Sequence, residues 1–157
     1  MRIREIEARD NAAIAAIVRK NLEAADLAVP GTVYFDEALD RLSEVYGRPD
    51  SKYFILEKEN EVVGGIGFAR FMDKADTAEL QKLYLDDSVK GEGLGYKLID
   101  RVEQEMRLAG FTRSYLETHN NLKAAIHIYE KAGYTEIERP AEVGHSFMNR
   151  FFIKTLG

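Results

Sequence analysis

Apolar residues recur along the chain with two different periods, and each period predicts a type of element. Residues 2–6 alternate between apolar and polar and predict a first strand. Asp10 is a plausible helix N-cap. The segment after it predicts a helix, because its apolar residues recur at helical spacing: Ile14, Ile17, Val18 and Leu22. A second amphipathic helix, closed by Gly47 and Pro49, is predicted from Phe35, Ala38, Leu39, Leu42 and Tyr46. Residues 53–71 predict an antiparallel hairpin with a tight turn near Glu59 and Asn60.

The second half of the chain mixes predicted strands with predicted helices. Strands are predicted at 77–86, 111–118, 134–138 and 147–154. Helices are predicted at 94–109, ending at Gly110, and at 122–129, ending at Gly133. Because helices separate the central strands and hairpins flank them, we predict an α/β fold with a mixed, mostly antiparallel central sheet flanked by helices. The chain shows no repeat or linker, which predicts a single domain over residues 1–157.

The strand at 77–86 departs from strict alternation. Leu80 would lie on the opposite face from Leu83 and Leu85 if every residue alternated. One extra residue between them, a β-bulge, would return all three leucines to one face. A strand buried on both faces would give the same irregular pattern, so both interpretations stay open.

Composition and charge limit the class of protein. The 157 residues are 45% hydrophobic and 31% charged, as in an ordinary globular domain. The absence of cysteine excludes disulfides, thiolate metal sites and a covalent cysteine intermediate. A formal charge of −5 argues against nucleic acid as a partner. No apolar run is long enough for a membrane span and no signal peptide is predicted, so we expect a cytoplasmic protein without a membrane partner.

Gly91, Gly93 and Gly95 alternate with other residues between a predicted strand and a predicted helix. Unpaired amides at a helix start, exposed by glycines, form a good phosphate cradle. A nucleoside-triphosphate P-loop is excluded, because the residue five positions after Gly91 is Tyr96 rather than glycine. A dinucleotide turn would need a third glycine where Leu98 stands, although Glu117 is placed as its ribose-binding acid would be. A dinucleotide-binding enzyme therefore remains the second hypothesis.

Residues 90–95, KGEGLG, resemble the [QR]-x-x-G-x-[GA] signature of the GNAT superfamily of N-acetyltransferases. Residues 125–134, AIHIYEKAGY, resemble the A-x-x-x-Y-E-K-x-G-[FY] segment of that family, and residues 79–85 resemble the strand before its glycine loop. The resemblance extends over nearly the whole chain, with its motifs concentrated in 77–134. One position departs from the pattern, because Lys90 stands where the family usually has Arg or Gln and lacks their planar donors.

The resemblance implies a GNAT-like acyl-CoA N-acyltransferase fold and acetyl-CoA as co-substrate. It implies a bulge in the strand at 77–86 that admits the pantetheine arm. The backbone of Leu83, Tyr84 and Leu85 would bind pantetheine, and an asparagine near Asn121 often contacts it. The residues expected around the pyrophosphate are Lys90, Gly91, Gly93, Leu94, Gly95 and Tyr96.

Acetyl transfer to an amine requires a proton acceptor for the ammonium and can use a proton donor for the leaving thiolate. By the resemblance, Glu79 is the candidate base and Tyr129 the candidate acid. With no cysteine, direct attack by the amine in a ternary complex is the simplest mechanism. The acceptor would be a small-molecule or peptide amine, and the protein a monomer or homodimer. A silent acyl-CoA binder is the third hypothesis.

The histidines give no sign of a metal site. His119, His127 and His145 lack the spacing of metal ligands, so we expect no bound metal.

Overall fold

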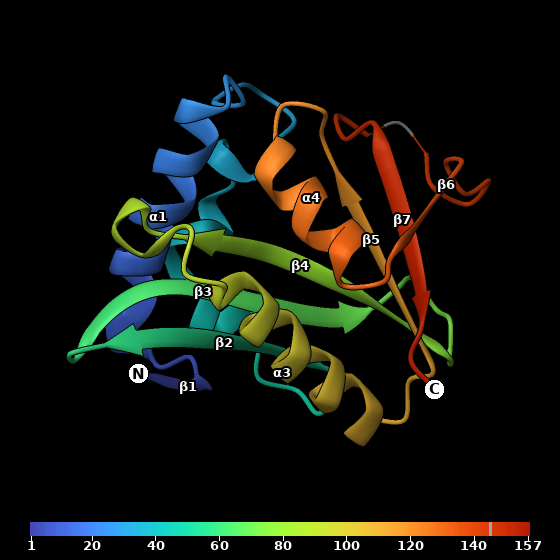
Figure 1. Ribbon diagram of the computed structural model, residues 1–157, viewed down its shortest axis with the longest axis horizontal. Coiled ribbons are helices and arrows are strands. Elements are labelled where there is room, and N and C mark those ends of the chain that lie inside the picture. The colour runs from blue at the N-terminus through green and yellow to red at the C-terminus, as the bar shows by residue number, and fades with distance from the viewer. Residues whose placement is uncertain (145) are drawn as a thin grey trace.

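The computed structural model describes residues 1–144 and 146–157. A seven-stranded sheet in the order β1-β2-β3-β4-β5-β7-β6 forms its centre (Figure 1). The strands are β1 (Arg2–Glu5), β2 (Ser51–Lys58), β3 (Glu61–Arg70), β4 (Thr77–Leu85), β5 (Arg113–Thr118), β6 (Thr135–Ile137) and β7 (Arg150–Thr155). Among the pairs that these described strands form, β4–β5 alone is parallel. The sheet is mixed and mostly antiparallel, as predicted.

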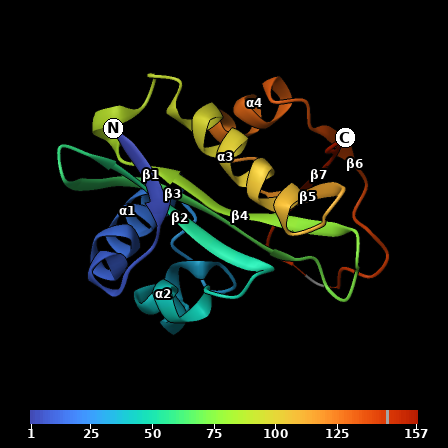
Figure 2. The same cartoon turned by 90° about the horizontal axis from the view of Figure 1, so that it is seen from below.

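Helices cover both faces of the sheet (Figure 2). The helices are α1 (Asn11–Ala24), α2 (Leu42–Val45), α3 (Leu94–Leu108) and α4 (Lys123–Lys131). Helices α1 and α2 lie on one face, and α3 and α4 lie on the other. Each face has its own apolar cluster, and the larger one lies under α3 and α4. Of the helices in the described part of the chain, none combines the length and apolar character needed to cross a membrane.

The predicted helix over 35–46 is largely wrong. The segment consists of short 3-10 turns at Val33–Phe35 and Glu37–Arg41, followed by the single α-turn of α2. Asp36 is extended, with φ −74° and ψ 120°, and its carboxylate accepts a bond from the Ala38 amide. That local bond competes with continuous helix, which is the usual effect of aspartate near a helix start.

Asp10 occupies the N-cap position of α1, as predicted, but its carboxylate does not cap the helix. It accepts hydrogen bonds from the Arg4 guanidinium at 2.7 and 2.9 Å and from the Glu7 amide at 2.8 Å. Glu57 binds the same guanidinium at 2.8 Å. This buried ion network ties the start of α1 to β1 and β2.

The β-bulge predicted in β4 is present. Gly65 pairs with Tyr84 and Gly67 with Gln81, so three steps along β4 match two steps along β3. Lys82 takes a left-handed conformation, with φ 52°. The three leucines Leu80, Leu83 and Leu85 all contact the apolar cluster under α3. The extra residue therefore reconciles their irregular spacing with a single buried face.

Glycines in β3 help to hold this bulge. A Cβ on Gly65 would lie 2.5 Å from the Tyr53 ring, and one on Gly67 would lie 2.6 Å from it. The bare backbone therefore admits the ring of Tyr53, which is 1% exposed. The Tyr53 hydroxyl donates a hydrogen bond to the Lys82 carbonyl at 2.8 Å. The glycine run of β3 thus positions the group that anchors the bulge.

Strands β4 and β5 pair only over a short stretch. Thr77–Glu79 pair with Arg113–Tyr115, and no further ladder joins the two strands within the described residues. Beyond Glu79 the strands diverge, as Figure 1 shows. The divergence opens the sheet in its middle, beside the glycine loop and α4.

Candidate active site

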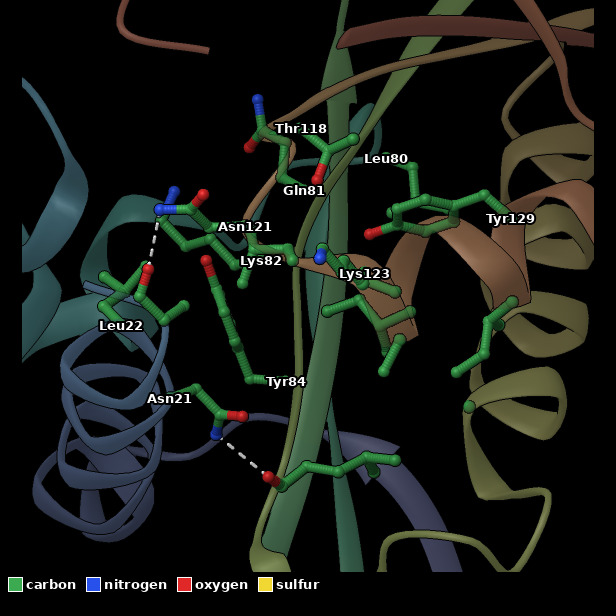
Figure 3. Close-up of a pocket in the computed structure, with 18 of the residues that line it drawn as sticks. Asn21, Leu22, Leu80, Gln81, Lys82, Tyr84, Thr118, Asn121, Lys123 and Tyr129 are labelled. Atoms are coloured by element: carbon green, nitrogen blue, oxygen red, sulfur yellow. Dashed lines mark hydrogen bonds between the residues drawn. The ribbon is translucent and has the colours of Figure 1, made fainter. Parts of the chain in front are cut away.

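A cleft of about 470 Å³ follows the opening between the two strands. Residues of β4 form its floor, and residues from α1, α4 and the glycine loop form its sides. Figure 3 shows Tyr129 from α4 with its hydroxyl directed into the cleft, and Asn121 beside the end of α1. A long, narrow ligand can lie in such an opening and contact the backbone of β4.

The cleft brings together most of the predicted site residues. Those in its lining are Glu79, Leu83, Tyr84, Leu85, Lys90, Gly91, Gly95, Asn121 and Tyr129. The other three are neighbours of Gly95 in the sequence but are not part of the lining. Gly93 is the N-cap of α3, Leu94 is buried in the core, and Tyr96 is 38% exposed on α3. The predicted contacts of these three involve chiefly the backbone at the start of the helix.

The glycine loop has the geometry of an anion cradle. Gly91 and Gly93 have φ values of 82° and 75°, and a Cβ on either would have no heavy atom within 4 Å. Their missing side chains therefore leave open space in front of the first amides of α3. A helix N-terminus with bare, outward-facing amides fits a pyrophosphate. The loop fits the phosphate part of CoA on this ground.

Lys90 is held against the end of α1. Its Nζ donates a hydrogen bond to Asn21 Oδ1 at 2.8 Å and forms an ion pair with Asp87 Oδ1 at 2.8 Å. Asn21 also donates from Nδ2 to the Leu85 carbonyl at 2.9 Å. Asn21 was missed by sequence reasoning, because it lies on the polar side of a helix far from the motifs.

Glu79 has an environment suited to a general base. Burial raises the pKa of its carboxyl to about 7, and the Glu117 charge adds to the increase. A hydrogen bond from Gln81 Nε2 at 3.0 Å acts in the opposite direction by favouring the ionised form. A base with a pKa near the working pH combines availability with proton affinity.

Tyr129 has the environment of a proton donor. It is 6% exposed, and its ring contacts those of Tyr134 and Phe152. Burial, with a smaller contribution from Tyr84, raises the pKa of the Tyr129 hydroxyl well above its usual value of 10.0. The phenol therefore keeps its proton at neutral pH while its oxygen faces the cleft. Tyr129 can therefore pack its ring in the core and still direct its hydroxyl into the cleft.

Asn121 reaches across the cleft. Its Nδ2 donates a hydrogen bond to the Ala25 carbonyl at 2.9 Å, which joins the turn before α4 to the end of α1. The backbone N–H of Asn121 donates to Nδ1 of His119 at 3.1 Å, and the His119 ring stacks on Phe147. Within residues 1–144 and 146–157, no group of three or more metal-ligating side chains could hold an ion. His145 lies outside the described residues.

Comparison with known proteins decides the family. The model of the Acetyltransferase (GNAT) family matches residues 14–134, well over half of the 157 residues. The chain belongs to this family. The predicted family and the predicted enzyme class, a GNAT-type N-acetyltransferase, are thereby confirmed.

Relatives and solved structures agree with this assignment. The GNAT protein is 39% identical over 138 residues to the Uncharacterized N-acetyltransferase YjgM of Escherichia coli (strain K12), covering 87% of this chain and 83% of the relative. An acetyltransferase of GNAT family from Staphylococcus aureus Mu50 has a TM-score of 0.83 at 20% identity, covering 99% of both chains. The putative acetyltransferase yncA from Salmonella typhimurium, solved with its cofactor acetyl-CoA, has a TM-score of 0.78 at 23% identity, covering 100% of this chain and 94% of that one. The predicted fold is confirmed.

Sequence reasoning missed a polar cluster of the GNAT protein beside Glu79. Lys82 donates to the Tyr46 hydroxyl at 3.3 Å, and that hydroxyl donates to Gln81 Oε1 at 2.5 Å. Tyr46 was predicted only as part of an amphipathic helix. The signal that could have found Lys82 is the bulge itself, because the extra residue of a bulge is turned away from the regular alternation.

Proposed function

We propose that this GNAT protein transfers the acetyl group of acetyl-CoA to the amine of a small molecule or peptide, by direct attack in a ternary complex. One observation carries the proposal: a single cleft is lined by the glycine cradle, by a carboxylate with a pKa of about 7 and by a buried phenol whose hydroxyl faces it. The family membership and the acetyl-CoA of the Salmonella structure support the same co-substrate.

Acetyl-CoA would supply an acetyl thioester. Amides at Gly91, Gly93 and Gly95 would bind the pyrophosphate, with Leu94 and Tyr96 contributing backbone at the start of α3 and Lys90 contributing charge. The backbone of Leu83, Tyr84 and Leu85 would bind the pantetheine arm along the open edge of β4. Asn121 would contact the arm from the opposite side of the cleft, close to where it now binds Ala25.

Two residues would move protons. Glu79 accepts a proton from the incoming ammonium, directly or through water, and so produces the neutral amine that attacks. As the C–S bond breaks, Tyr129 donates its hydroxyl proton to the departing thiolate. The nitrogen that has formed the new C–N bond loses its second proton to solvent, and solvent returns a proton to the Tyr129 phenolate. The raised pKa of each group supports its role, because Glu79 retains affinity for a proton and Tyr129 holds one at neutral pH.

Ligand-dependent melting separates the three hypotheses. The purified protein is melted with acetyl-CoA, with NAD and with ATP, and then mixed with acetyl-CoA and a panel of amines while free thiol is measured. We expect stabilisation by acetyl-CoA and thiol release that depends on an amine. Stabilisation by NAD but not acetyl-CoA would favour a dinucleotide enzyme. Stabilisation by acetyl-CoA without release for any amine would favour a silent binder.

A further inference from the structure

Lys82 carries a positive charge into the cleft at the bulge of β4. It lines the cleft together with Glu79 and Gln81, and Figure 3 draws Lys82 and Gln81 among the lining residues. Its Nζ lies 3.3 Å from the Tyr46 hydroxyl and 5.6 Å from the centre of the Tyr46 ring. Among residues 1–144 and 146–157, no carboxylate forms an ion pair with it. The ammonium is thus half-buried with one neutral oxygen as its partner.

Another lysine of the cleft lining is in a different situation. Lys90, at the glycine-loop end, has both Asp87 and Asn21 as partners. Withdrawing an ammonium from water without a carboxylate partner costs free energy, so such a group is a natural binding point for an anion. Burial lowers the pKa of Lys82, whereas Glu79 and Asp36 raise it. The Lys82 ammonium is consistent with a binding site for an anionic group.

Hydrogen bonds connect this ammonium to the candidate base. Lys82 donates to Tyr46, Tyr46 donates to Gln81 at 2.5 Å, and Gln81 donates to Glu79 at 3.0 Å. This series of hydrogen bonds fixes a cation and a carboxylate on the floor of the cleft, with neutral polar groups between them. A ligand with an ammonium next to a carboxylate is complementary to this pair of charges.

We propose that Lys82 binds a carboxylate of the acceptor, and that the acceptor is therefore a free amino acid or a closely similar amine with a neighbouring carboxylate. The inference rests on the proposed function and specifies its acceptor. The amine of such a ligand faces Glu79 while its carboxylate bonds to Lys82. A polyamine would instead bring a second ammonium against Lys82, and the side chain of a protein lysine has no carboxylate beside its amine.

Matched acceptor pairs test the assignment. Each of the common L-amino acids and its carboxamide, which keeps the α-amine but removes the carboxylate charge, is assayed with acetyl-CoA. For the preferred side chain, kcat/KM of the amino acid should exceed that of the amide by about tenfold or more, the usual size of one charge-assisted bond. Lys82→Met should raise KM for the amino acid by about 10- to 100-fold, raise KM for the amide much less, and leave KM for acetyl-CoA within about twofold.

Two variants separate charge from folding. Lys82→Arg keeps a cation and should restore part of the preference, whereas Lys131→Met removes an exposed lysine at the end of α4 and should change nothing. Thermal melts check that Lys82→Met, which keeps a side chain of similar length in the same left-handed backbone, folds normally. Equal use of amino acid and amide by the natural protein, or an unchanged preference in Lys82→Met, overturns the inference.

The proposed function can fail separately. The same amino acids and amides are titrated into the CoA-bound protein by calorimetry. Binding of amino acids that depends on Lys82, without any acetyl transfer, supports the carboxylate site and contradicts the proposed function. Acetylation of amines that lack a carboxylate, with no use or binding of amino acids, overturns the carboxylate site and leaves the proposed function intact.

Discussion

Gln81 donates a hydrogen bond to Glu79, from Nε2 to Oε1, over 3.0 Å. The opposite end of the Gln81 amide accepts a bond from Tyr46, so the amide has one orientation and presents its NH₂ group to the carboxylate. This donor favours the ionised form of Glu79 and opposes the effect of burial on its pKa. Gln81 is therefore a positioning residue for the candidate base.

Removing the Gln81 amide should move the pH dependence of the reaction. In Gln81→Met the pKa of Glu79 rises, because burial and the Glu117 charge then act without the opposing bond. The acidic limb of the kcat/KM profile should shift to higher pH, with activity at the plateau much less affected. An unshifted limb would mean that Glu79 is not the group that titrates.

Glu79→Gln should lower kcat by about 10²- to 10⁴-fold, the usual contribution of a general base. The same variant should be more stable than the natural protein at pH 8. The folded-state pKa of Glu79, about 7, exceeds its unfolded value of 4.5, so its ionisation destabilises the fold as pH rises from 4.5 through 7. The gain in unfolding free energy should be about 3 kcal/mol at pH 8 and near zero at pH 4. Denaturant titrations at the two pH values measure it, with Glu138→Gln on the exposed surface as control.

Tyr129→Phe keeps the buried ring and removes the hydroxyl. We expect kcat to fall by about 10²-fold, within the range of general acid catalysis, while KM for acetyl-CoA changes little. Tyr134→Phe is the matched control, because its hydroxyl bonds to Ser114 at 2.7 Å inside the core and not to the cleft. If Tyr129→Phe turns over at the normal rate, the hydroxyl is not the proton donor.

Most of the fold could be predicted from the sequence because the segments with periodic apolar residues are long. The strands around the Glu59–Asn60 turn, α1 and α3 carry clear apolar patterns, and both turn residues have positive φ values of 52° and 67°. The segment over 35–46 failed because apolar residues at helical spacing also suit consecutive 3-10 turns. There, the side-chain bond of Asp36 to the backbone decided the local structure.

The candidate site was predictable where the backbone carries the function and unpredictable where side chains meet across the fold. The loop glycines and the bulge leave local marks in the sequence. The contacts of Asn21 with Leu85, and of Tyr46 with Gln81, join residues 64 and 35 positions apart. No local pattern encodes such pairs, because they depend on where α1 and the segment before β2 lie on the sheet.

Gly93→Asn tests the phosphate cradle. Asparagine tolerates the left-handed conformation better than other residues with a side chain, and a Cβ at this position meets no protein atom within 4 Å. The variant should fold, yet bind acetyl-CoA more weakly by about tenfold or more, because the new side chain occupies the space before the helix amides. Calorimetry measures the affinity. Gly110→Asn, at a glycine with φ 96° and equally open space beyond α3, carries the same strain and should bind normally.

Asp10→Asn tests the buried ion network at the base of α1. Burial raises the pKa of Asp10, but the hydrogen bonds from Arg4 and from the Glu7 amide outweigh it and hold the pKa below 3.8. The variant leaves the 7% exposed Arg4 with Glu57 as its main partner. Unfolding free energy at pH 7 should fall by about 3 kcal/mol, as for other buried pairs that lose one charge.

The pH dependence identifies the cause of that loss. The contribution of Asp10 is present above its unfolded pKa and is lost as pH falls through the lower folded value. The difference between the natural protein and Asp10→Asn should therefore shrink as pH falls from 5 toward 2, as measured by urea titrations. Asp73→Asn, at an exposed position in the turn after β3, should show no such difference at any pH. A deficit in Asp10→Asn that stays constant down to pH 2 would point to lost packing rather than lost charge.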